Sequence, residues 1–97
     1  MYEIGQQIKT QLIEGLQVRK PLKNEALEVL SITLEKGSVL PDHTSPRDAT
    51  LIVLEGTLDF FINGKTFPLE HYEDFSFPKE EVHRVTARED SRFLIIR

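Results

Sequence analysis

The side chains best suited to chemistry in this sequence are the imidazoles of His43 and His83. His43 precedes the apolar run at residues 50–54, and His83 opens the alternating run at residues 83–87. A neutral imidazole can bind a transition metal, or accept a proton near neutral pH. His71 lies in a polar turn, where we expect a surface residue. The chain contains no Gly-x-Ser-x-Gly nucleophile motif and no phosphate-binding loop.

Short strands are expected to position these histidines. Leu30, Ile32 and Leu34 alternate with polar residues, which is typical of a strand with one buried face. Asn63-Gly64 predicts a tight hairpin turn between strands at residues 58–62 and 65–69, because both residues tolerate positive φ. Prolines and glycines separate the remaining apolar runs.

The pattern as a whole predicts an all-β protein. Further strands are expected at 75–77, 83–87 and 93–97. About eight short strands without an internal helix indicate a sandwich or a closed barrel. Residues 1–14 are ambiguous, and we expect a strand or irregular arm that packs on the barrel or on a partner subunit.

Two spaced motifs resemble those of the cupins, which are small jelly-roll barrels. Gly37, His43 and Gly56 have the spacing of the first cupin motif, and Pro78 and His83 have that of the second. The Asn63-Gly64 hairpin stands between the motifs, as in cupins of minimal length. The resemblance covers roughly residues 27–97. It implies an all-β, double-stranded β-helix (jelly-roll) cupin barrel at residues 15–97, preceded by a short arm at residues 1–14.

The resemblance is incomplete at the metal site. Metal-binding cupins use two histidines and a glutamate from the first motif and one histidine from the second. Here Ser45 and Ala49 occupy the second histidine and the glutamate positions, so only His43 and His83 remain as candidate metal ligands. Catalytic zinc and non-haem iron sites commonly have three protein ligands. Two predictions for the cofactor therefore stay open, namely none and a divalent transition metal. In the second case Glu81 is a candidate third ligand.

In the second motif, Glu80 and Ala87 stand at the family's glycine and asparagine positions. In the cupin register, a mostly apolar cavity with two imidazoles near its mouth is implied. Arg47 at the rim is a candidate partner for a carboxylate. The expected ligand-binding residues are His43, Ser45, Arg47, Ala49, Phe77 and His83. The alternatives are that the histidines bond backbone carbonyls, that the phenylalanines fill the core and that Arg47 is a surface residue.

Three functions follow from these expectations. The first is a small-molecule-binding cupin-fold protein with a degenerate, metal-free site. The alternative is a metal-dependent enzyme of dioxygenase, isomerase or lyase type, acting on a small polar metabolite. The third is a dimerisation unit, and a homodimer is expected in each case, since a barrel this small gains from an added interface.

Composition restricts the partners further. The chain has 97 residues, a net charge of −4 and a pI near 5.3, which argues against general nucleic-acid binding. There is no cysteine, so disulfides and thiolate sites are excluded. No apolar run is long enough to span a membrane, and the first twenty residues have no signal-peptide core. We therefore expect a cytoplasmic protein that binds a small molecule, and neither nucleic acid nor membrane.

Overall fold

The computed structural model describes residues 1–97 and contains nine strands and no helix. No helix that could span a membrane is present. The strands are β1 (Leu16–Lys23), β2 (Glu28–Leu34), β3 (Val39–His43), β4 (Ala49–Glu55), β5 (Thr57–Ile62), β6 (Lys65–Glu70), β7 (Asp74–Phe77), β8 (His83–Ala87) and β9 (Ser91–Ile96).

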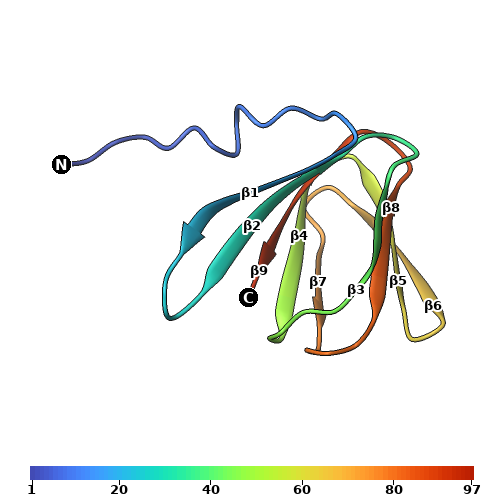
Figure 1. Cartoon of the computed structure of the whole chain (residues 1–97). Coiled ribbons are helices and arrows are strands. Elements are labelled where there is room, and N and C mark those ends of the chain that lie inside the picture. The colour runs from blue at the N-terminus through green and yellow to red at the C-terminus, as the bar shows by residue number, and fades with distance from the viewer.

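These strands form two antiparallel sheets that face each other (Figure 1). One sheet has the order β1-β2-β9-β4-β7, and the other has the order β3-β8-β5-β6. Neighbours in each sheet are mostly distant in sequence, as in a jelly roll. The predicted all-β jelly-roll class is therefore confirmed.

The hairpin between β5 and β6 turns at the predicted position. Asn63 has a φ of 54° and Gly64 a φ of 72°, the left-handed conformation that a two-residue hairpin turn requires. The turn sets the register in which Ile62 pairs with Lys65 and Phe60 with Phe67.

Two strands, β1 and β3, were not predicted. Each contains a proline, Pro21 in β1 and Pro41 in β3, and proline cannot donate a backbone hydrogen bond. In both strands the pairing register shifts around the proline. Because β1 and β3 are edge strands, such interruptions are tolerated there.

The core fills the space between the sheets. Its largest fully buried apolar side chains are Phe60, Phe93, Leu34, Leu51 and Leu58. Phe60 lies at the centre of an aromatic group, with ring centroids 4.8 Å from Phe75 and 5.0 Å from Phe77. Aromatic clusters of this kind stabilise beyond the area they bury.

The first strand begins at Leu16, so residues 1–15 form no strand. Gln11 is nevertheless buried, and its side chain hydrogen-bonds both the hydroxyl and the carbonyl of Ser31 on β2. The hydroxyl of Thr33 donates to the carbonyl of Leu12 at 2.6 Å. The arm therefore covers the outer face of β2, while Met1, Tyr2 and Ile4 are exposed.

Candidate functional site

The two motif histidines lie directly opposite each other on neighbouring strands. His43 at the end of β3 pairs with His83 at the start of β8. Their ring centroids are 4.1 Å apart, with the planes inclined by 64°. The register shift between Leu40 and His43 precedes this pair. Two imidazoles that are forty residues apart in sequence therefore meet at one end of the molecule.

His83 is enclosed by aromatic rings. Only 2% of the residue is exposed. Its ring stacks on Phe60 at 5.3 Å with an interplanar angle of 12°, and lies 4.6 Å from Phe77. The Nδ1 atom lies 3.0 Å from the carbonyl oxygen of Glu81, whereas the Nε2 atom is buried without any hydrogen-bond partner. A buried polar atom without a partner is uncommon in native proteins, and Nε2 of His83 is free to accept a hydrogen bond.

Backbone carbonyls fix the tautomer of both rings. A carbonyl oxygen only accepts hydrogen bonds, so Nδ1 of His83 must carry the proton that it donates to Glu81. Nδ1 of His43 likewise donates to the carbonyl of Pro41, at 2.7 Å. In the neutral form, each Nε2 is then left with a lone pair. The site presents two hydrogen-bond acceptors.

Burial keeps His83 neutral. Desolvation lowers the pKa of His83 below its ordinary value of 6.5. The hydrogen bond to the Glu81 carbonyl opposes this effect, while electrostatic interactions with His43 and Arg97 add to it. The lowered pKa favours the acceptor form of the ring at neutral pH.

The histidines line a cavity of about 220 Å³ between the two sheets. Four of the predicted ligand-binding residues border it, namely His43, Ser45, Phe77 and His83. The remaining wall consists of Val18, Leu30, Ile32, Leu40, Thr44, Ile95 and Arg97. Mostly apolar walls with a few polar groups are typical of small-molecule sites. That these residues bind a ligand stays a prediction.

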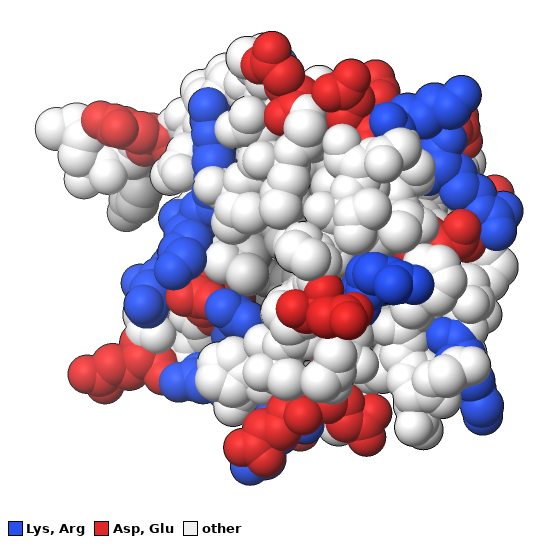
Figure 2. Space-filling model, turned by 45° about the vertical axis from the view of Figure 1, so that its right-hand side comes forward, with Lys and Arg blue, Asp and Glu red and all other residues white.

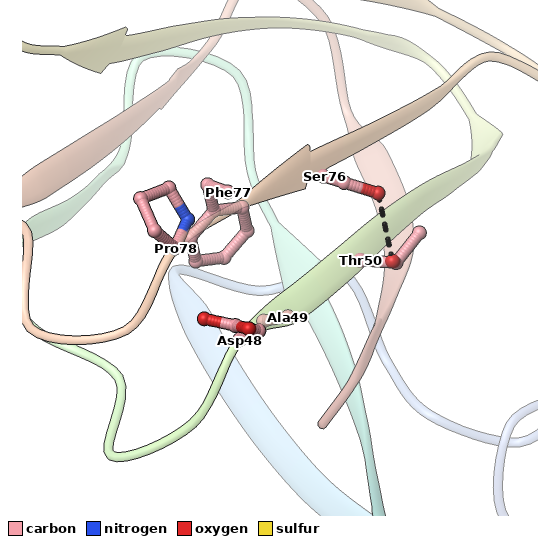
Figure 3. Close-up of a pocket in the computed structure, with 6 residues that line it drawn as sticks. All are labelled: Asp48, Ala49, Thr50, Ser76, Phe77 and Pro78. Atoms are coloured by element: carbon pink, nitrogen blue, oxygen red, sulfur yellow. Dashed lines mark hydrogen bonds between the residues drawn. The ribbon is translucent and has the colours of Figure 1, made fainter.

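The other two predicted residues lie elsewhere. Arg47 does not border this cavity, and its guanidinium donates a hydrogen bond to the carbonyl of Ala26 at 3.3 Å. Ala49 is buried on β4 opposite Phe77 of β7, and does not border the histidine cavity. It instead borders an outer hollow of about 420 Å³, where the hydroxyls of Thr50 and Ser76 hydrogen-bond at 2.9 Å (Figure 3). No histidine borders that hollow.

Arg97 is a cavity residue that the sequence analysis missed. It follows β9, and its backbone exchanges two hydrogen bonds with Glu28 at the start of β2. Its guanidinium also forms an ion pair with the Glu28 carboxylate, at 2.9 Å. Nothing in the spacing of the motifs indicates this position, because the β2–β9 pairing brings the end of the chain to the cavity.

The loop before His83 is held against the loop after β3. The backbone N–H of Glu80 donates to the carbonyl of Ser45 at 2.9 Å. Glu80 has a φ of 67°, a left-handed conformation that glycine adopts more easily. This is the position at which the family motif has glycine. Glu80 therefore adopts a backbone conformation that glycine would favour at this position.

The residues present do not fit a typical protein metal site. No group of three histidine, cysteine, aspartate or glutamate side chains is close enough to hold a metal ion. Ser45 Oγ donates to the carbonyl of Arg47 at 2.6 Å, and Asp48 accepts from the backbone of Lys79. Glu81 contributes its backbone carbonyl to His83. Two imidazoles alone fall short of the three protein ligands usual for zinc or non-haem iron.

Comparison with known proteins identifies the family. The cupin domain model matches residues 30–97, most of the chain, so the protein belongs to the cupin family. The resemblance inferred from the two motifs that contain His43 and His83 is thereby confirmed. No match was found among curated proteins.

Solved structures agree with this fold. An RmlC-like cupin protein from Desulfovibrio desulfuricans is 20% identical, with a TM-score of 0.86 over 99% of this chain and 95% of that one. KdgF from Halomonas sp. is 24% identical, with a TM-score of 0.79 over 89% of this chain and 81% of that one. A cupin superfamily protein from Desulfitobacterium hafniense is 10% identical, with a TM-score of 0.81 over 89% and 79%. At these identities the likeness concerns the fold alone.

Proposed function

We propose that this cupin binds a small molecule in the histidine cavity without a metal ion. The observation that carries the proposal is that His83 borders the cavity and that its buried Nε2 atom has no partner. An unpaired acceptor costs free energy unless a bound donor satisfies it. A ligand that donates a hydrogen bond to this atom would remove that cost.

A thermal-shift screen of small fragments, with a chelator present, tests this proposal. We expect some fragments that carry a hydroxyl or N–H donor to raise the melting temperature of the wild type but not that of His83→Phe. Phenylalanine keeps a ring beside Phe60 and Phe77 and removes the acceptor. The matched control is His71→Phe, since His71 is exposed and contacts Tyr72. Equal shifts in the wild type and in His83→Phe would contradict the proposal.

The alternative function is a metal-dependent enzyme of dioxygenase, isomerase or lyase type. One observation favours it: both imidazoles leave Nε2 unprotonated in the same cavity, which is the form that binds metal. Metal content of protein purified without an affinity tag decides between the two functions. About one equivalent of a transition metal, lost in a His43→Ala/His83→Ala variant, would support the enzyme. Absence of bound metal after reconstitution would support the binding protein.

We also propose a homodimer in which β1 contributes to the interface. β1 is an edge strand, and its Leu16, Val18 and Leu22 are 39%, 50% and 47% exposed. Exposed apolar side chains along an unpaired strand edge favour association. Sedimentation equilibrium should give twice the monomer mass, and Val18→Glu should shift the protein towards the monomer. A monomeric wild type at micromolar concentration would contradict this proposal.

A further inference from the structure

Arg97 gives the histidine cavity a fixed cation. Its backbone N–H donates to the Glu28 carbonyl at 2.9 Å, and the Glu28 N–H donates back to the Arg97 carbonyl. Its guanidinium contacts the Glu28 carboxylate, and 20% of the side chain is exposed. Arg97 also borders the same cavity as His43 and His83. Glu28 therefore fixes the guanidinium of a residue that borders the cavity, and the Arg97 side chain remains partly accessible.

The charge around Arg97 is not balanced. Lys20 and Lys23 lie 3.8 and 3.7 Å from the second oxygen of Glu28, so three cations surround one carboxylate. A second hollow, of about 300 Å³, shares Arg97 with the histidine cavity and is also bordered by Lys23 and Arg47. Lys and Arg side chains follow the left-hand side of the molecule in Figure 2, around a few acidic groups. This flank has an excess of positive charge and favours an anion.

His83 and His43, which border the same cavity as Arg97, need a hydrogen-bond donor. Nε2 of His83 is an acceptor without a partner, and His43 presents a second acceptor. A carboxylate cannot donate to either atom. A ligand ammonium could donate, but its charge would be disfavoured beside the excess cations. A hydroxyl satisfies the acceptor without adding charge.

The size and the walls of the cavity limit the rest of the ligand. Its volume of about 220 Å³ is that of roughly seven water molecules. Leu30, Ile32 and Ile95 supply apolar wall. A molecule that fits in this cavity is short, so its hydroxyl and carboxylate are separated by few bonds.

We infer that the cavity selects a short hydroxycarboxylate with an apolar body. The carboxylate binds the guanidinium of Arg97, and the hydroxyl donates to Nε2 of His83. Guanidinium and carboxylate form charge-assisted hydrogen bonds, which are stronger than neutral ones. This inference rests on the proposed function, and adds the chemical class of the ligand to it.

Titration calorimetry in low salt with a chelator tests the inference through four molecules of one skeleton. The probe is 2-hydroxy-3-methylbutanoate. Its amide removes the charge, 3-methylbutanoate removes the hydroxyl, and valine replaces the hydroxyl with an ammonium. We expect the hydroxy acid to bind about tenfold more tightly than each of the other three, as the loss of one charge-assisted or buried hydrogen bond implies.

Three variants locate the carboxylate. Arg97→Gln should weaken binding of the hydroxy acid about tenfold and leave binding of the amide unchanged. Glu28→Gln should strengthen binding of the hydroxy acid severalfold, because it frees the guanidinium from its competing carboxylate. Arg84→Gln is the matched control, since Arg84 stacks on Phe61 away from the cavity. We expect it to leave the affinity unchanged.

Each contrary outcome is distinct. Equal affinity for the acid and the amide, or an unaffected Arg97→Gln, would overturn the inference about the carboxylate. If none of the four probes binds while screening fragments depend on His83, the ligand class is wrong and the proposed function stands. If no molecule of any class depends on His83, both fail. A lower affinity in Glu28→Gln would mean that Glu28 positions Arg97. It would overturn the claim that Glu28 competes with the ligand for the guanidinium.

Discussion

Burial of a neutral imidazole makes the stability of this protein depend on pH. The pKa of His83 is lowered by desolvation from its ordinary value of 6.5. Below pH 6.5 the unfolded chain therefore takes up a proton that the folded chain does not, so the free energy of unfolding falls. The fall ends below the folded pKa, where both states are protonated.

Urea unfolding of the wild type and His83→Phe over a series of pH values measures this effect. We expect the stability of the variant to rise relative to the wild type as the pH drops below 6.5, since the variant cannot take up this proton. His71→Phe should keep the wild-type profile because His71 is exposed. Parallel curves for the wild type and His83→Phe would contradict the assignment.

Gly56 is required by both space and conformation. Its φ is 85°, and a Cβ atom there would lie 2.3 Å from Ser91 Oγ and 2.4 Å from the Asp90 carbonyl oxygen. We expect Gly56→Ala to lower the free energy of unfolding by about 2–3 kcal/mol. Gly5→Ala is the control, because nothing lies within 4 Å of that position. Equal stability of the two variants in urea unfolding would be inconsistent with this close packing.

Glu80 offers the opposite change. Its φ of 67° is a left-handed conformation, which costs a residue with a Cβ atom about 1–2 kcal/mol. Glycine avoids this cost, but its greater loss of backbone entropy on folding offsets about half of the gain. Glu80→Gly should therefore raise the free energy of unfolding by about 0.5 kcal/mol. Glu81→Gly, at a neighbour without positive φ, should lower it. A destabilised Glu80→Gly would refute the strain assigned to this loop.

At the scale of elements, Gln11 is the buried side chain that links the N-terminal arm to β2. Gln11 is 3% exposed, donates to the carbonyls of Ser31 and Gln17, and accepts from the Ser31 hydroxyl at 2.6 Å. Gln11→Ala would leave these groups unpaired, and should cost about 2 kcal/mol in unfolding free energy. Gln7→Ala, at an exposed position, should change it by less than about 0.5 kcal/mol. Similar values for both variants would show that the arm does not depend on this contact.

Alternating apolar residues predict β2, and the Asn63-Gly64 turn predicts the β5–β6 hairpin. The edge strands β1 and β3 escape prediction for a physical reason. Most of their residues are exposed, and Pro21 and Pro41 interrupt them, so neither period nor propensity marks them as strands. β1 and β3 form strands because they pair with β2 and β8, respectively.

At the scale of the whole molecule, the fold brings distant residues to one cavity. The two family motifs predict that His43 and His83 share a site, because each motif lies within one short segment of the sequence. In the structure the two residues pair directly. Arg97 cannot be predicted in this way, because only the pairing of β2 with β9 brings it beside the histidines. Arg47 lies nearer to His43 in sequence, but its side chain bonds the carbonyl of Ala26 and does not border the cavity.

The most direct test of a metal-free cavity with two acceptors is a ¹⁵N correlation spectrum of the histidine rings. It is recorded at pH 7.5 with a chelator, before and after addition of a fragment that stabilises the protein. We predict that His43 and His83 both carry their proton on Nδ1, and that the Nε2 resonance of His83 shifts on binding. A proton on Nε2 of His83 in the free protein, or a bound fragment that leaves both rings unchanged, would contradict the account.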